Sequence, residues 1–434
     1  SLAVPSVSSV EHAEVFVLHD ERDVRKFDAL CVQAVLDGSV VVSPVMLSPG
    51  DALFFDGYGD GAVSKQTSRS IVGQTGPEHV DMTFHAAHAS TRGRLLNVMR
   101  VLGINGYHEP VTSYFSEWGT KWFHDAAAVL VEDGVVLAAV EEERLTRKKH
   151  TGSFPARAID FCLSARGISL DDVDHIAVGE EGGHGAYRDA ELSAEKIAHT
   201  LRVVGLTKTD LTAKIRLVEH HVAHAMSAFL PACMDASLVV TLDGFGDGIA
   251  GSVSLGQGGK LETLRRIEVE QSLGNFYGAV LPYLGYSAFD EYKVMGLASY
   301  GDPTRARHLV SQIYELLPEG AYRFRIASTN ELIRLLGPFG PPRFEGTPFL
   351  QHHMDLAAGF QEAFERIVIH LLTHFRETTG VRSLCFAGGC AQNSVFNGRL
   401  AASGLFDAIY VHPASNDAGT ALGAALSVAQ VASG

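Results

Sequence analysis

Short apolar runs separated by acidic, glycine-containing turns occur twice along the chain, roughly a hundred residues apart. The first copy, residues 100–140, holds three apolar runs, the last two joined by Glu132-Asp133-Gly134. The second copy, residues 236–267, begins with an apolar run that ends in the acidic turn 243–248 and continues as a hairpin. Apolar runs of this length, bounded by Gly and Asp, predict buried strands and hairpins. The repetition predicts an internally duplicated α/β domain.

The C-terminal third adds alternating helices and strands. Apolar residues at helical spacing predict a long amphipathic helix over 355–379 that Gly380 ends. A buried strand, Ser383 to Ala387, then runs into Gly388-Gly389 and a helix beginning near Asn393. Glycines between a strand and a helix let phosphates approach backbone N–H groups. A strand, an acidic turn and a hairpin occurring twice are typical of the two-lobed actin, sugar-kinase and Hsp70 architecture, which is the duplicated ribonuclease-H-like (ASKHA) fold.

The first 97 residues follow a different pattern. An apolar run at 39–47, the turn 48–51 and the run 52–55 predict strand, turn and strand, hence a small β-rich module. The sequence of this turn and the strand after it faintly resembles cupin-like dioxygenases, and His79 and Asp81 have the spacing of two ligands of their iron site. The alternative is a partial or degenerate β module with a structural role. We therefore expect a β-rich extension at 1–97 and an actin-like domain at 98–434, with lobe I at about 98–235 and lobe II at about 236–434.

The stretch from Glu219 to Phe229 carries the strongest chemical signal. It predicts a helix in which His220 and His224, four residues apart, share one face and can chelate a metal. The alternative is a pair of buried histidines bonded to backbone. Asp417, at a loop-to-helix junction, either completes that metal site or is a helix N-cap. Asp243 either holds a metal or water against phosphates, or belongs to a tight turn only.

Composition narrows the function classes. A formal net charge of -15 argues against a broad nucleic-acid surface and favours small-molecule partners. The five cysteines are an odd number without a CxxC pair, which predicts reduced thiols and a cytoplasmic protein. No apolar stretch has membrane-spanning length and no signal peptide is recognisable, so no membrane association is expected.

Five separated motifs resemble one family in order and spacing. They are His220-His221-Val222-Ala223-His224, Leu242-Asp243-Gly244, Asp290 to Ala298, Gly388 to Asn393, and Asn416 to Gly419. Together with Phe123 to Ala127 and Glu141 to Lys149, they are similar to the O-carbamoyltransferases of nodulation factors and natural products (NodU/CmcH type), over nearly everything from Met99 onward. These enzymes modify antibiotics among other products.

The resemblance implies a reaction in two steps. Carbamoyl phosphate and ATP give carbamoyl-adenylate, and the carbamoyl group then passes to a hydroxyl of a small-molecule acceptor with release of AMP. It implies a divalent metal, Fe²⁺ or alternatively Mg²⁺, held by His220, His224 and Asp417. The implied nucleotide-binding and catalytic positions are Asp243, Gly244, Gly388, Gly389 and Asn393. His124 is the candidate base, and Lys293 either neutralises phosphate charge or forms a surface ion pair.

Two departures leave alternatives open. Family members usually continue into a YrdC-like domain that makes the adenylate, whereas this sequence ends at Gly434, so a fragment or a separate adenylate source is expected. The family does not normally carry the N-terminal module. The other interpretations are a tRNA threonylcarbamoyltransferase-type subunit and a non-catalytic nucleotide-binding remnant. Acceptor loops at 109–121 and 183–198, the acceptor itself and association as a homo-oligomer cannot be read from the sequence.

Overall fold

The computed structural model describes residues 10–16, 30–36, 39–45, 98–107, 123–181, 192–326 and 329–433. The chain divides into two compact units, Ser1–Leu95 and Leu96–Gly434. The first contains an antiparallel sheet of β1 (Val10–Phe16), β2 (Leu30–Leu36) and β3 (Ser39–Val45). The strand expected at 52–55, the His79 and Asp81 pair, the loop 109–121 and most of the loop 183–198 lie outside the described residues.

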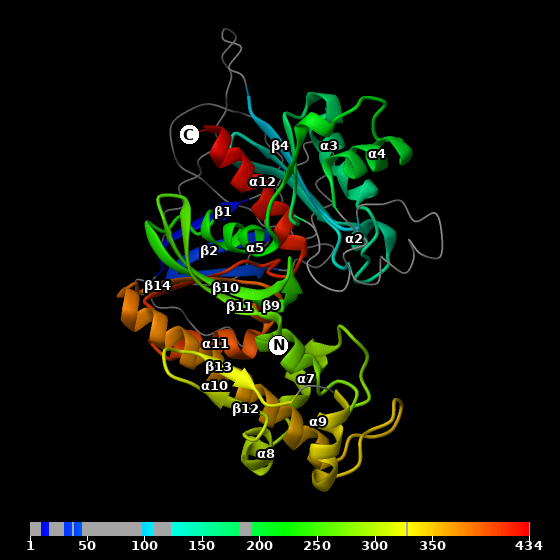
Figure 1. The fold of residues 1–434 in the computed structure, drawn as a ribbon. Helices are drawn as coiled ribbons and strands as arrows, with labels where there is room; N and C mark the ends of the chain where they lie inside the picture. The colour runs from blue at the N-terminus through cyan, green and yellow to red at the C-terminus, as the bar shows by residue number, and fades with distance from the viewer. Residues whose placement is uncertain are drawn as a thin grey trace, which may run out of the picture. The chain divides into compact units, whose positions relative to one another are not determined.

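The second unit contains two five-stranded sheets with the same topology (Figure 1). Their orders are β6-β5-β4-β7-β8 and β11-β10-β9-β14-β15. In each sheet the first strand is central. On one side it pairs antiparallel with the first strand of a hairpin, and on the other it pairs parallel with a later strand, which pairs parallel with the edge strand. This repeated order confirms the two-lobed, duplicated ribonuclease-H-like fold predicted from the sequence. Each sheet defines one lobe.

The first lobe is built from β4 (Arg100–Asn105), β5 (Ala127–Glu132), β6 (Val135–Glu141), α2 (Glu142–Thr146), α3 (Ala156–Arg166), η1 (Leu170–Asp172), β7 (His175–Val178), α4 (Ala194–Val203), η2 (Thr212–Lys214), β8 (Ile215–Leu217) and α5 (His220–Phe229). Its core lies between the sheet and α3 and α4, where Leu102, Leu130, Ile159 and Ile176 are fully buried. The hairpin predicted around Glu132-Asp133-Gly134 is confirmed as β5 and β6.

The second lobe contains β9 (Ala236–Gly246), β10 (Ile249–Gln257), β11 (Lys260–Glu268), η3 (Val269–Gln271), α6 (Leu273–Gly278), α7 (Glu291–Ala298), α8 (Pro303–Val310), β12 (Tyr314–Leu316), β13 (Tyr322–Phe324), α9 (Thr329–Leu336), η4 (Gly337–Phe339), α10 (Gln351–Thr379), β14 (Ser383–Ala387), η5 (Gly389–Gln392), α11 (Ser394–Ala402), β15 (Ala408–Val411) and α12 (Ala418–Ser433). The predicted long helix is α10, which starts four residues earlier than expected and ends at Gly380 with φ +70.

The helices α5 and α12 follow the last strand of each sheet and join the lobes. Figure 1 shows α12 between the first sheet and α5. Helix α12 lies close to both β4 and α5 because Gly103 and Gly423 lack side chains. A Cβ at Gly103, in β4, would lie 1.9 Å from the carbonyl oxygen of Ala421, and a Cβ at Gly423, in α12, would lie 1.7 Å from the carbonyl oxygen of Ala223. This packing brings the N-terminal ends of both helices to the junction of the lobes.

Two further observations concern the described residues. Cys162, Cys233, Cys385 and Cys390 are free thiols. None of the described helices combines the length and apolar character needed to cross a bilayer.

Candidate functional site

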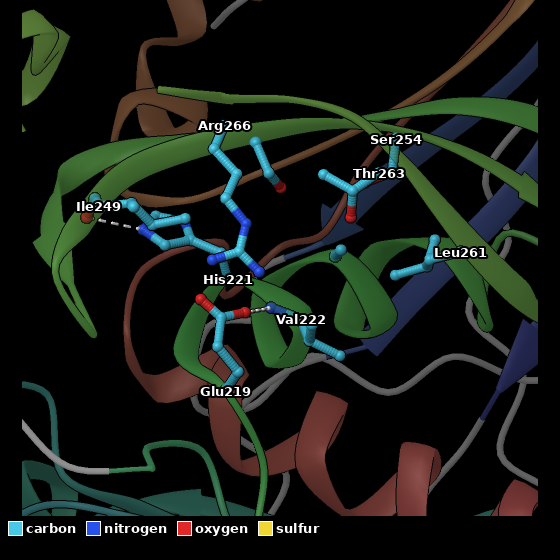
Figure 2. A pocket seen from close by; sticks show the side chains of 10 residues that line it. Glu219, His221, Val222, Ile249, Ser254, Leu261, Thr263 and Arg266 are labelled. Atoms are coloured by element: carbon cyan, nitrogen blue, oxygen red, sulfur yellow. Dashed lines mark hydrogen bonds between the residues drawn. The ribbon is translucent and has the colours of Figure 1, made fainter. Parts of the chain in front are cut away.

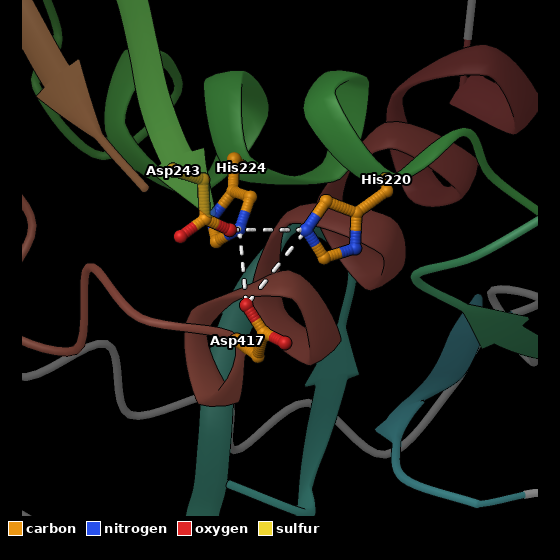
Figure 3. Close-up of side chains that lie close together, drawn as sticks. All are labelled: His220, His224, Asp243 and Asp417. Carbon is orange, nitrogen blue, oxygen red and sulfur yellow. Dashed lines mark hydrogen bonds and ion pairs between the residues drawn. The ribbon is translucent and has the colours of Figure 1, made fainter. Parts of the chain in front are cut away.

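Four side chains converge where the two helices meet. His220 and His224 come from α5, Asp243 lies near the end of β9, and Asp417 immediately precedes α12 (Figure 3). One ligand atom from each lies within 4.8 Å of the others. The structure thus brings together the three residues predicted to hold a metal and adds Asp243, for which the sequence had suggested nucleotide binding, catalysis, or holding a metal or water against phosphates.

The distances within this cluster are those of ligands around one centre. Nε2 of His220 and Nε2 of His224 both lie 3.4 Å from Oδ2 of Asp243, and 3.7 Å and 3.4 Å respectively from Oδ1 of Asp417. Ligands at about 2.1 Å from a metal, separated by tetrahedral or octahedral angles, are about 3.0 to 3.4 Å apart. The spacing therefore fits a cation after a small contraction.

Unpaired buried atoms support the same interpretation. Both ring nitrogens of the fully buried His224 and Oδ1 of Asp417 make no hydrogen bond among the described residues. Such groups are costly unless something pairs with them. The backbone carbonyl of Asp417 accepts from Thr420 N and Oγ1, but its carboxylate faces the histidines. A set of two imidazoles and two carboxylates suits Fe²⁺ and similar transition metals better than Mg²⁺, which prefers oxygen ligands.

The close approach of histidines and carboxylates in the cluster shifts their pKa values. Burial alone would lower the pKa of His220, but the carboxylates of Asp243, Asp417 and Asp247 outweigh burial and raise it to about 10. Burial likewise opposes ionisation of Asp243, yet its contacts with His220 and His224 hold its pKa well below the usual range. In the metal-free chain, proton and carboxylate charges therefore compensate each other.

Two carboxylates fix the start of α5. Glu219 is the N-cap residue, and its Oε2 accepts a hydrogen bond from Val222 N at 2.7 Å. Oδ2 of Asp247, in the turn after β9, accepts from His220 N at 2.8 Å and from Glu181 N at 2.9 Å. Asp247 thereby ties the second lobe to the helix that carries the histidines and to the end of the first sheet.

The neighbouring histidine has a different role. Nδ1 of His221 lies 3.0 Å from Thr241 Oγ1 and its Nε2 lies 3.1 Å from the carbonyl oxygen of Ile249. Burial, with the charges of His220 and His224, lowers its pKa to about 3. His221 is thus a neutral residue of the packing between α5 and the second sheet. Beside it lies a cavity of about 30 Å³, room for a water-sized molecule only, which Glu219 and Arg266 also line (Figure 2).

The candidate base adjoins the cluster from the first lobe. Nε2 of His124 lies 3.4 Å from Oδ2 of Asp417, and its Nδ1 lies 2.9 Å from Oδ2 of Asp125. Burial would lower the pKa of His124, but Asp417 and Asp125 outweigh it and raise it to about 9. The pattern His-Asp in the sequence could have pointed to Asp125, but only the fold reveals His150, whose Nδ1 lies 2.8 Å from Asp125 Oδ1.

Sequence reasoning also missed Glu180, which follows β7. Burial, together with the charge of Asp247, raises its pKa to about 7. No motif of the sequence marks this residue, because only the fold brings its charge under the influence of Asp247, His220 and Asp417. The preceding Gly179 packs against α12, where a Cβ would lie 2.7 Å from Thr420.

The glycine-rich segment lies against the acidic turn. Gly389 N donates to Asp243 Oδ1 at 3.1 Å, and a Cβ at Gly388, which has φ +87, would lie 2.3 Å from the carbonyl oxygen of Leu242. Gly244 is close to Gly274, where a Cβ would lie 2.6 Å from Gly244 N. Three of the positions predicted to bind nucleotide are therefore grouped around Asp243.

Asn393 and Lys293 occupy different surroundings. Oδ1 of Asn393 caps α11 by accepting from Phe396 N, and its side-chain amide is paired with that of Gln361 in the buried core. Lys293 is 41% exposed and forms an ion pair of 2.6 Å with Asp290. In this structure the side chain of Asn393 therefore stabilises α11 and the core, and that of Lys293 forms a surface ion pair.

The family follows from comparison with known proteins. The sequence profile described as "Carbamoyltransferase N-terminus" matches residues 117–202 and 184–426. The chain belongs to the carbamoyltransferase N-terminus family. It is 43% identical over 343 residues to nodulation protein NolNO of Sinorhizobium fredii, covering 76% of this chain and 49% of that protein. It is 24% identical over 362 residues to nodulation protein U of Bradyrhizobium diazoefficiens, covering 71% and 60%.

This carbamoyltransferase-family chain spans about half the length of the curated relatives it matches. Among solved structures, full-length HypF in its phosphate- and nucleotide-bound form is similar at 15% identity with a TM-score of 0.48, over 77% of this chain and 56% of that one. The fold assignment comes from the two sheets of the family member itself.

Proposed function

We propose that this chain transfers a carbamoyl group from carbamoyl-adenylate, formed from carbamoyl phosphate and ATP, to a hydroxyl of a small-molecule natural product. The observation that carries the proposal is the convergence of His220, His224, Asp243 and Asp417 beside His124 at the junction of the lobes, in a member of the carbamoyltransferase family. A remnant would have no reason to keep the ring nitrogens of His224 and Oδ1 of Asp417 buried without hydrogen bonds.

His220, His224, Asp243 and Asp417 would hold the divalent cation, for which Fe²⁺ suits the donor set. Such a cation supplies Lewis acidity that polarises the carbamoyl carbonyl. It would also compensate the carboxylate charge of Asp417, which raises the pKa of His124. That lowers the pKa of His124 toward the range in which an imidazole accepts a proton near neutral pH.

The transfer step exchanges one bond of the carbamoyl carbon for another. The acceptor hydroxyl gives its proton to Nε2 of His124, its oxygen forms a bond to the carbamoyl carbon, and the bond from that carbon to the AMP phosphate oxygen breaks. Backbone N–H groups at Gly388 and Gly244 would orient the adenylate phosphate, while the N–H of Gly389 holds the carboxylate of Asp243. We place the catalytic domain at about 98–434 and, since the described cysteines are free thiols, in the cytoplasm.

The test is carbamoyl transfer by the purified chain with ATP, carbamoyl phosphate and hydroxylated acceptors, with and without a separately produced YrdC-like domain. AMP release and the acceptor mass report turnover, and metal analysis reports bound cation. We expect turnover that His220→Ala abolishes, with Lys260→Ala, on the far hairpin turn, as the matched control. Absence of turnover in both arms, together with absence of bound metal in protein refolded with Fe²⁺ or Zn²⁺, would overturn the proposal.

A further inference from the structure

One buried carboxylate is shared by two imidazoles next to the cluster of His220, His224, Asp243 and Asp417. Oδ2 of Asp125 lies 2.9 Å from Nδ1 of His124, and Oδ1 of Asp125 lies 2.8 Å from Nδ1 of His150. Asp125 is 6% exposed, and its pKa is lowered because hydrogen bonds and charge from both histidines outweigh its burial. A carboxylate only accepts, so each oxygen requires an N–H from the ring that it contacts.

The backbone around this carboxylate is held in an unusual conformation. Asp125 has φ +54, a left-handed value that is uncommon outside glycine. Asn105, at the end of β4, donates its side-chain amide to the carbonyl oxygens of His124 and Asp125, both at 3.2 Å. These bonds fix the turn that aims Asp125 at the two rings. Backbone outliers that the surroundings maintain in this way cluster at functional sites.

Two more left-handed residues meet at the same place. His150 has φ +53, and Phe289, which precedes α7 in the second lobe, has φ +68. The ring of Phe289 stacks on His150 with centroids 5.2 Å apart and meets His124 edge-on at 4.8 Å. A residue of each lobe thus restrains the imidazoles, Asp125 by hydrogen bonds and Phe289 by packing.

We propose that Asp125 is a positioning residue that holds the neutral rings of His124 and His150 in the Nδ1–H tautomer, so that His124 presents the lone pair of Nε2 to the reacting hydroxyl. For its catalytic consequence this inference rests on the proposed function, but the tautomers themselves do not. The orientation matters because a base with its proton on the wrong nitrogen cannot accept one from the substrate.

A different role for the same residues is a second cation site. Asp125, Glu143 and His150 each offer an atom within 4.8 Å of the others. Their contacts favour hydrogen bonding instead: Glu143 Oε2 accepts from the backbone N of His150 at 2.7 Å, and Nδ1 of His150 is paired with Asp125. A second bound cation is therefore an outcome that the test must be able to detect.

The decisive variant is Asp125→Asn. A carboxamide offers one acceptor oxygen and one NH₂ donor, so it can receive an N–H from one ring only. The other ring must then accept at Nδ1 and carry its proton on Nε2. Two-bond ¹H–¹⁵N spectra of ¹⁵N-histidine protein, loaded with Zn²⁺ as a diamagnetic probe, distinguish the tautomers; His124→Gln and His150→Gln assign the signals.

We expect protonated Nδ1 on both rings in the unmodified protein and on one ring only in Asp125→Asn. In turnover assays we expect kcat to fall by about tenfold or more while KM for the acceptor stays within about twofold. Glu143→Gln, which retains an acceptor for the His150 backbone, is the matched control and should keep both tautomers.

Several results would overturn the inference. One is an Nε2–H tautomer at His124 or His150 in the unmodified protein, a measurement that stands even if the variant fails to fold. Another is Asp125→Asn with both Nδ1 atoms still protonated. A third is the loss of one of two bound Zn²⁺ equivalents in that variant. Correct tautomers without turnover in any form would instead contradict the proposed function and leave the positioning role of Asp125 intact.

Discussion

Gly246 lies so close to His220 that a Cβ atom on the glycine would be 2.1 Å from Cδ2 of the imidazole. The imidazole of His220 thus packs directly on the last residue of β9. We expect Gly246→Ala to displace the His220 ring, because the added methyl group would overlap it. Metal affinity should fall by about ten- to a hundredfold, as it does when a group that orients a ligand is disturbed. Isothermal titration with Zn²⁺ measures the change.

Gly296→Ala is the matched control for that substitution. Gly296 lies in α7, and no atom comes within 4 Å of a Cβ built there. Alanine is also the better helix former, so stability should be unchanged or rise by up to about 1 kcal/mol. Equal metal affinities of Gly246→Ala and Gly296→Ala would show that His220 is not a ligand or that the end of β9 shifts away from the ring at little energetic cost.

The three histidines of α5 should separate into two functional groups. His220→Ala and His224→Ala are expected to lose bound metal, because each removes one nitrogen from the cluster. His221→Gln should keep the metal, but its free energy of unfolding should be lower by about 1 to 3 kcal/mol, because the substitution disturbs the buried hydrogen bonds to Thr241 and Ile249. Metal content and urea unfolding, measured on the same preparations, test this separation. Metal loss in His221→Gln with unchanged stability would contradict it.

The raised pKa values of His220 and His124 predict a pH dependence of the metal-free chain. The folded chain keeps a proton on each histidine up to about pH 10 and about pH 9, whereas an unfolded histidine loses it near 6.5. The stabilisation is therefore complete below about pH 6.5 and is lost as pH rises toward 9 or 10. Each histidine contributes a slope of about -1.4 kcal/mol per pH unit in that window.

Urea unfolding of the chelator-treated protein between pH 6 and 9.5 measures that slope, and His220→Gln should reduce it. Binding of a cation requires neutral imidazoles, so it should release protons, and apparent metal affinity should increase with pH over the same range. A metal-free chain that gains stability from pH 6.5 to 9 would contradict the charge assignment.

The fold was largely predictable because its signals are local. The strands from Ala236 to Ile267 and the helix ending at Gly380 follow from apolar runs and turn residues, and they lie where the sequence placed them. The duplication was also visible in sequence, since each lobe repeats the same order of elements. Helix α10 begins earlier than predicted because Gln351 to Met354 carry no strong periodic signal.

The site was predictable in part only. His220 and His224 are one helical turn apart, a spacing that sequence reveals, whereas the meeting of Asp243 with Asp417 depends on the packing of α12 across both lobes. His150 lies 25 residues from Asp125, and no periodicity links them. Long-range contacts between side chains of different elements are set by tertiary packing, which the local pattern does not encode.

Lys293 offers a direct test of its two interpretations. Its ion pair with Asp290 is exposed to solvent, so Lys293→Met should barely change stability. If the ammonium also meets a phosphate, the KM for nucleotide should rise about tenfold in Lys293→Met. Asp290→Asn, which breaks the pair but keeps the cation, should leave or lower that KM. Unchanged KM in both variants would assign Lys293 to the surface ion pair alone.

Asn393 is expected to act on stability more than on nucleotide binding. Its Oδ1 caps α11, and its amide exchanges two hydrogen bonds with Gln361, a residue that is 3% exposed. Asn393→Ala removes a cap, worth about 1 kcal/mol, and leaves the Gln361 amide without that partner, which costs about 1 to 3 kcal/mol more. Urea unfolding should therefore show a loss of about 2 to 4 kcal/mol.

The neighbouring Ser394→Ala is the control for Asn393→Ala. Among the described residues the Ser394 hydroxyl donates to the sulfur of Met295 at 3.7 Å, a weak contact, so this substitution should change the free energy of unfolding by under about 0.5 kcal/mol. Nucleotide titration completes the comparison. Because the Asn393 amide is already satisfied inside the core, ATP affinity measured at a temperature where both variants are folded should differ between them by less than about threefold. Unchanged stability with lost ATP binding in Asn393→Ala would instead place this side chain against the nucleotide, and would require the Gln361 pair to open when ligand binds.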